Sequence, residues 1–133
     1  MAVIPGDLKY TTSHEWVRVD AGGDVATIGI TDHAQAELGD IVYLDLPETG
    51  RIVQHDGQFG EVESVKAVSD LFSPVSGEVI ETNTGISDTT EVVNQDPYGN
   101  GWLIKIRMSD TAELTGLMDA AAYEKFAESG GGH

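Results

Sequence analysis

Lys66 is the residue whose type and position most clearly offer chemistry. It is the only lysine or arginine between Ile52 and Ile104, a span that also contains nine carboxylates. Val65 and Ala67 flank it without charge or bulk, so a modifying enzyme could reach the amine. Acylation would remove the charge and lengthen an already flexible four-carbon side chain. The sequence therefore predicts that Lys66 is a site of covalent modification.

Other kinds of site are poorly represented. The chain has no cysteine, so no protein thiol can act as nucleophile or metal ligand, and sulfur redox chemistry would have to come from an attached group. His14, His33 and His55 show no i,i+4 spacing, which disfavours a metal site. No phosphate-binding loop and no Gly-x-Ser-x-Gly elbow occur. We predict no catalytic residues and no metal.

The composition narrows the class of partner. The chain has 133 residues, 40% of them apolar, and a formal charge of −16. This charge disfavours nucleic acid and anionic membranes and favours proteins with basic docking faces. No apolar run approaches the roughly 18 residues of a membrane span, and no signal peptide is recognisable. We expect a monomeric cytoplasmic protein, or one of the mitochondrial matrix if a leader was removed.

The first half of the chain predicts short strands around one helix. Residues 10–19 and 25–30 favour strands and flank a Gly-Gly turn, so they are expected to form a hairpin. A helix is expected over 31–39, with Asp32 as its N-cap, Gln35 as the capping-box partner and Gly39 at its left-handed end. Further strands are expected over 41–46 and 51–53.

Lys66 falls near the tip of a predicted hairpin. Its strands lie near 58–65 and 75–82, which gives a hairpin segment of about 58–82. A rigid pair of strands with an exposed tip is suited to presenting a side chain to another protein. Residues 83–101 are rich in turn formers and are expected to be a surface loop, broken by a short strand or turn at 91–93.

The last part of the chain changes from strand to helix. Residues 102–107 predict a strand with Trp102, Ile104 and Ile106 on one face. From 109 to 127 the pattern is helical, with Ser109 or Asp110 capping one segment and Asp119 a second, while 129–133 are expected to fray. The whole chain therefore predicts a single mainly β domain, a small sandwich with a helical appendage.

Several short blocks occur in an order that is specific when they are taken together. Around the lysine they are Glu63-Ser64-Val65-Lys66-Ala67, Ser69-Asp70 and 73–79; elsewhere they are His14-Glu15-Trp16-Val17, 29–35, 38–40, 46–50, 93–98 and Gly101-Trp102-Leu103. In this order they resemble the H protein of the glycine cleavage system, over roughly residues 8–126. One departure is the segment 86–94, which lacks the proline that the family often has there.

The resemblance implies a fold and a function. The fold is a lipoyl/biotinyl-type sandwich of two small antiparallel sheets, a barrel-sandwich hybrid, with a short internal helix, a C-terminal helix and a core over about 8–126. Lys66 would carry lipoate in amide linkage and shuttle the aminomethyl group of glycine. The implied partners are a pyridoxal-phosphate glycine decarboxylase, a tetrahydrofolate-dependent aminomethyltransferase, an FAD-containing dihydrolipoyl dehydrogenase and lipoyl-attaching enzymes. The positions that match the family's arm-contact residues are Ser13, Glu15 and Asp70, where a carboxylate could pair with the ammonium of the cargo.

Alternative functions remain open at this stage. A biotin carrier typically flanks its lysine with methionines, whereas Val65 and Ala67 stand here. Lipoyl domains of 2-oxoacid dehydrogenases are usually shorter and are joined by linkers to a catalytic domain. An H-like protein could instead relay lipoate to such dehydrogenases. A small acid–base enzyme using His14, Glu15 and Asp70 is the reading from another class, and its missing nucleophile argues against it.

Overall fold

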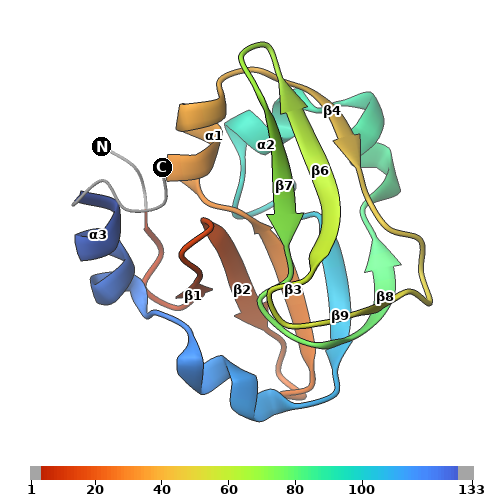
Figure 1. Ribbon diagram of the computed structural model, residues 1–133, viewed down its shortest axis with the longest axis vertical. Coiled ribbons are helices and arrows are strands. Elements are labelled where there is room, and N and C mark those ends of the chain that lie inside the picture. The colour runs from red at the N-terminus through yellow and green to blue at the C-terminus, as the bar shows by residue number, and fades with distance from the viewer. Residues whose placement is uncertain (1–3, 129–133) are drawn as a thin grey trace.

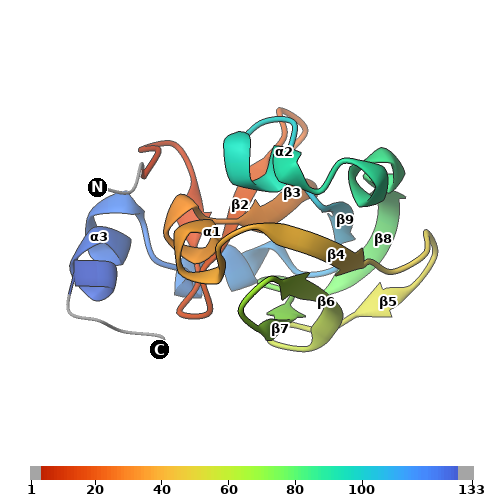
Figure 2. The same cartoon turned by 90° about the horizontal axis from the view of Figure 1, so that it is seen from above.

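Two antiparallel sheets with several short helices around them make up the protein in the computed structural model, which describes residues 4–128 (Figure 1 and Figure 2). The predicted fraying of 129–133 lies outside the described residues. One sheet has the order β1-β2-β3-β9-β8-β5 and the other β4-β6-β7. The predicted mainly β sandwich with internal and C-terminal helices is confirmed. The strands are β1 Lys9–Tyr10, β2 Glu15–Val19, β3 Val25–Ile30, β4 Ile41–Asp45, β5 Ile52–Val53, β6 Gln58–Ser64, β7 Val68–Phe72, β8 Gly77–Thr82 and β9 Ile104–Met108.

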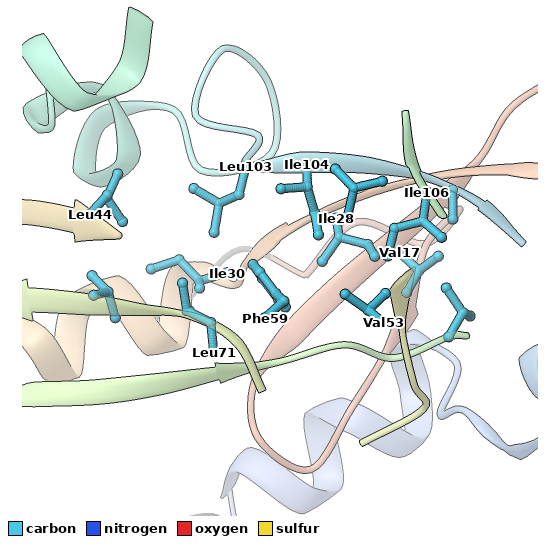
Figure 3. Packing of buried hydrophobic residues seen from close by; sticks show 14 of the residues in the cluster. Val17, Ile28, Ile30, Leu44, Val53, Phe59, Leu71, Leu103, Ile104 and Ile106 are labelled. Carbon is cyan, nitrogen blue, oxygen red and sulfur yellow. The ribbon is translucent and has the colours of Figure 1, made fainter. Parts of the chain in front are cut away.

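The main core lies between these sheets. Ile28, Ile104 and Ile106 from the larger sheet are fully buried, and Phe59 and Leu71 face them from β6 and β7 (Figure 3). Alternate residues of a strand point to opposite faces, so the intervening polar residues of β6 and β7 lie on the outer side. Burial of these large apolar side chains fixes the position of the β6–β7 pair over the larger sheet.

A second, smaller cluster packs outside the larger sheet. Trp16, Tyr10 and Tyr123 are fully buried in it, and the rings of Tyr10 and Tyr123 stack with their centroids 4.6 Å apart. Tyr123 comes from α3 (Ala120–Glu128), so this cluster attaches the C-terminal helix to β1 and β2. Gly29 lies against the Trp16 indole, where a Cβ would come within 2.7 Å of the ring.

The predicted partner of the first hairpin strand is wrong. β6 pairs with β7, and the strand expected at 75–82 is β8, which lies in the larger sheet between β9 and β5. The hairpin around Lys66 is therefore shorter than predicted, with only 65–67 between its strands. The error arose because 68–72 alternates weakly between apolar and polar residues, so it did not stand out as a strand. The position of Lys66 at the turn is confirmed.

The helices differ from prediction at several points. Thr31, not Asp32, caps α1 (Asp32–Leu38), because its hydroxyl accepts from the amide of Ala34. Gly39 ends this helix at φ 77°, as predicted. Residues 84–88 form the 3₁₀ helix η1 and 91–95 form α2, so the predicted strand or turn at 91–93 is wrong.

The C-terminal region is also more broken than expected. The first helical segment is the 3₁₀ helix η2 (Thr111–Gly116) with Asp110 as its cap, and Asp119 caps α3 as predicted. Ile104 and Ile106 share the buried face of β9, but Trp102 precedes that strand and packs against the second cluster. Within residues 4–128, no helix is long and apolar enough to span a membrane.

Candidate functional site

The turn that bears Lys66 is held by one hydroxyl. Ser64 Oγ accepts hydrogen bonds from the amides of Lys66 (3.2 Å) and Ala67 (3.1 Å) and donates to the carbonyl of Ala67 (3.3 Å). The Ser64 amide closes the turn by donating to the same carbonyl at 2.8 Å. Because Ser64 is buried while Lys66 is exposed, the turn holds its backbone firmly and directs the lysine outward. Figure 1 shows this turn at one extreme of the molecule.

A second contact fixes the turn against α1. The amide of Val65 donates to the carbonyl of Asp40 at 3.0 Å. The side chain of Lys66 then runs over Gly39, where a Cβ would lie 3.1 Å from Lys66 Cε. Gly39 takes a positive φ that L-residues rarely adopt, and its missing side chain makes room for the lysine. The lysine therefore starts at the C-terminal end of α1.

A cleft of about 350 Å³ lies along the same helix. α1 and β7 form its two sides, and the residues before β2 close it; the lining side chains are Ser13, His14, His33, Ala34, Glu37, Leu38, Ser69, Asp70 and Phe72. Leu38, Ala34 and Phe72 give it apolar walls, and Ser13 and Asp70 supply polar groups. Leu38 directly precedes Gly39, so the cleft and the side chain of Lys66 both reach the C-terminal end of α1, although Lys66 does not line the cleft. An apolar chain ending in a polar group, attached at Lys66, fits this combination of walls.

Glu15 lies behind this cleft and does not line it. Its side chain is 1% exposed. Oε1 accepts from Ser13 Oγ at 2.5 Å and Thr11 Oγ1 at 2.9 Å, and Oε2 accepts from the Phe72 amide at 3.3 Å. Burial raises the pKa of Glu15 from 4.5 to about 7, although these three hydrogen bonds oppose the shift. Ser13 and Phe72 both line the cleft, so they connect Glu15 to it.

His14 and His33 meet at the end of the cleft nearest α3. Their rings stack with centroids 4.6 Å apart. His14 Nδ1 lies 2.6 Å from the hydroxyl of Tyr123, which also lies 2.7 Å from Thr31 Oγ1. Thr31 is the cap of α1, so one tyrosine of the C-terminal helix holds both the start of α1 and the loop before β2. Burial raises the pKa of Tyr123 to about 12, which keeps this hydroxyl protonated.

The sequence matches the family described as Glycine cleavage H-protein over residues 8–130. The chain belongs to the glycine cleavage H-protein family. It is 52% identical over 130 residues to the glycine cleavage system H protein of Symbiobacterium thermophilum, covering 98% of this chain and all of that one. The H protein of Rubrobacter xylanophilus is 60% identical over 114 residues, which cover 86% of this chain and 89% of the relative.

A solved H-protein structure has the same fold. The glycine cleavage system H protein from Mycobacterium marinum superposes with a TM-score of 0.84 at 39% sequence identity, covering 96% of this chain and 99% of that one. Membership of the H-protein family, expected from the ordered sequence blocks, is thus confirmed. Both the lysine turn and the cleft lie inside the matched region.

Of the three arm-contact candidates, the structure brings Ser13 and Asp70 to the cleft and leaves Glu15 beneath it. Asp70 Oδ1 also accepts from Gln58 Nε2 at 3.0 Å. The histidine and helix residues of the lining were missed, apart from His14. The i,i+4 pairs on α1, Ala34–Leu38 and His33–Glu37, were the available signal for that wall.

The residues considered as acid–base groups or metal ligands each have separate partners in the structure. His14 bonds to Tyr123, Glu15 to Thr11 and Ser13, and Asp70 to Gln58. His55 lies away from the other two histidines, beside Asp56 at 3.4 Å. Among residues 4–128 no group of three His, Cys, Asp or Glu side chains could hold a metal ion.

Proposed function

We propose that this H-family protein is the lipoyl carrier of a glycine cleavage system, with lipoate joined by an amide bond to Lys66 Nζ. The observation that carries the proposal is the position of Lys66 at a braced, exposed turn, with its side chain over Gly39, the residue that follows the cleft residue Leu38. When bound, lipoate supplies a dithiolane whose sulfur can take up the aminomethyl group. The chain supplies a fixed base for a mobile arm, which keeps the cargo at high local concentration near a docked enzyme.

The proposed route runs between three enzymes. The carrier receives the aminomethyl group at a pyridoxal-phosphate glycine decarboxylase and delivers it to a tetrahydrofolate-dependent aminomethyltransferase. An FAD-containing dihydrolipoyl dehydrogenase restores the disulfide. With no cysteine of its own, the chain offers no competing thiol for exchange. We further propose that it does this as one domain, with residues 8–126 as the working core.

Between visits to these enzymes, the cleft is proposed to shelter the cargo. Asp70 can pair with the cargo's ammonium at the cleft wall, and Ser13 Oγ can bond to it. Glu15 acts through Ser13: its carboxylate accepts a hydrogen bond from the Ser13 hydroxyl and so holds that hydroxyl in place. An ammonium close to Glu15 would favour the ionised carboxylate and lower its pKa below the value of about 7 set by burial.

The attachment site can be tested by intact-mass spectrometry. We expect one lipoyl adduct after incubation with lipoic acid, ATP and a purified lipoate ligase. Lys66→Arg should abolish the adduct, together with exchange of the glycine carboxyl group catalysed by glycine decarboxylase. Lys125→Arg, at an exposed lysine of α3, is the matched control and should retain both. An adduct that survives Lys66→Arg, or a biotin adduct in its place, contradicts the proposal.

The proposed protection of the cargo by the cleft is tested by measuring how fast the charged protein loses ammonia. On lipoylated protein charged with the aminomethyl group, we expect Asp70→Asn and Glu15→Ala to speed the spontaneous release of ammonia several-fold while the amount of adduct stays the same. Glu61→Gln is the control, because Glu61 lies directly opposite Asp70 in the sheet and does not line the cleft. Equal release rates in all variants would contradict the sheltering role of the cleft. They would leave the attachment of lipoate to Lys66 untouched.

A further inference from the structure

Exposed apolar side chains gather around the lysine turn. Val42, Tyr43, Val65 and Val68 are 52–67% exposed. Among the described residues the other large apolar side chain of this kind is Ile52, which lies on β5 in the other sheet. Scattered exposed apolar residues need no explanation, but a contiguous group marks an interaction site. We call these four residues the tip patch.

The strand register places two members of the tip patch on one face of the sheet. Tyr43 lies opposite Glu63 and Glu63 opposite Val68, so all three side chains point the same way across β4, β6 and β7. The pairing shifts between Ile41 and Tyr43, with Ile41 opposite Ser64 and Tyr43 opposite Glu63. Val42 is therefore the extra residue of a β-bulge, which turns a second apolar side chain of β4 out to solvent.

A row of carboxylates borders the patch. Asp45 lies opposite Glu61, and Glu61 lies opposite Asp70, so three acidic side chains cross the sheet next to the row of Tyr43, Glu63 and Val68. Like charges in directly opposite positions destabilise a sheet. A partner with lysine and arginine around an apolar recess would complement both features and relieve this repulsion. The occupant that fits is thus a folded protein with a basic rim.

The length of the Lys66 side chain indicates which partner enzyme docks at the turn. An unmodified lysine side chain extends only about 6 Å beyond its Cα, at roughly 1.5 Å per bond before bond angles are counted. An enzyme that joins a group to Nζ must come this close, so it has to cover the residues around the turn. An enzyme that acts at the far end of an attached group can stand off by the length of that group.

We propose that the tip patch, Val42, Tyr43, Val65 and Val68, is the docking surface for the enzyme that attaches the lipoyl group, which rests on the proposed function above. In that step the Lys66 nitrogen bonds to the carbonyl carbon of an activated lipoyl adenylate. The bond between that carbon and the phosphate oxygen breaks, AMP leaves, and the nitrogen releases a proton to solvent. The tip patch seats the amine and takes no part in the bond changes.

The test compares attachment kinetics in two variants. Purified lipoate ligase, lipoic acid and ATP are mixed with increasing concentrations of this protein, and the initial rate of adduct formation is read by intact mass. We expect the double variant Tyr43→Thr/Val68→Thr to raise KM for this protein about tenfold and to leave kcat within about twofold, as loss of an apolar contact centre predicts. Threonine keeps a β-favouring side chain in both strands.

Ile52→Thr is the matched control, since Ile52 is as exposed as the tip residues but lies on the other sheet, and its KM should not change. A wild-type protein that gains no adduct overturns the proposed function itself. A normal wild-type adduct with equal KM in all variants overturns only the docking surface. So does a double variant that is attached normally but, once lipoylated, loses activity with the aminomethyltransferase, because the patch then serves that enzyme.

Discussion

The lysine turn and the floor of the cleft are built in opposite ways. Most hydrogen bonds of the turn run among Ser64, Lys66 and Ala67, no more than three residues apart, and one longer-range bond joins Val65 to Asp40. The floor joins residues separated by 57 positions, Glu15 and Phe72, and by 109 positions, His14 and Tyr123. Local bonds make a turn that keeps its shape while facing solvent, whereas the floor depends on the packing of the whole domain.

The difference also concerns charge. Lys66 is exposed, where water stabilises its charge and partners can reach it. Glu15 is 1% exposed, and burial disfavours its charged form. A charged group at the surface keeps its water, whereas a buried carboxylate has to be stabilised by the protein groups around it. The cleft floor should therefore contribute pH-dependent stability that the turn lacks.

Glu15→Gln tests this difference with the largest expected effect. The pKa of Glu15 is raised from 4.5 to about 7, so between these values the folded protein binds more protons than the unfolded chain. The raised pKa of Glu15 therefore adds about 3 kcal/mol to the free energy of unfolding below pH 4.5. This contribution is lost as the pH rises through 7. Relative to wild type, Glu15→Gln should gain that amount between pH 4.5 and 8 in urea unfolding.

The control for this prediction is Glu61→Gln, on the outer side of the sheet next to Asp70. Its unfolding free energy should run parallel to that of wild type over the same pH range. If the Glu15→Gln curve is also parallel to wild type, Glu15 is ionised in the folded protein at low pH, and the contrast between floor and turn fails.

The same contrast explains what the sequence could predict. The position of Lys66 at a strand turn and the helix end at Gly39 are local features, and both were predicted correctly. The wrong strand partner for β6 and the missed wall of the cleft both depend on long-range pairing. Nothing within a few residues of His33 indicates that His14 stacks on it, or that Tyr123 bonds to Thr31 from 92 positions away.

The family resemblance bridged part of this gap. It pointed to Ser13 and Asp70, which the fold does bring to one cleft, although nothing in their local sequence relates them. It also pointed to Glu15, but it could not show that this carboxylate lies under Ser13 and not at the surface. Burial of a polar residue depends on which elements pack above it, here β7 and the loop before β2.

Tyr123→Phe, at the floor of the cleft, should change the free energy of unfolding by less than Glu15→Gln does. The change keeps the ring, which stacks on Tyr10, and removes the hydroxyl that bonds to His14 and Thr31. Two buried partners lose a hydrogen bond, so we expect the free energy of unfolding to fall by about 2 kcal/mol in urea. Tyr43→Phe removes the same atom from a tip-patch ring that is 55% exposed, and should change stability by less than about 0.5 kcal/mol. Equal effects of the two changes would contradict the contrast.

Ser64→Ala tests the turn itself and should have the smallest effect on global stability. It removes one hydroxyl that receives two amides and donates to one carbonyl. The amides of Lys66 and Ala67 lie in an exposed turn where water can replace the lost acceptor, so we expect a loss of only about 1 kcal/mol.

The local consequence of Ser64→Ala should be much larger than the global one. Hydrogen exchange at the amides of Lys66 and Ala67 should speed up at least several-fold, while the amide of Phe72, which donates to Glu15, keeps its wild-type rate. Exchange that rises equally at all three amides would mean that the turn opens only together with the cleft floor. Exchange confined to the turn would show that the base of the lysine is an independent unit, which can open while the floor of the cleft keeps its structure.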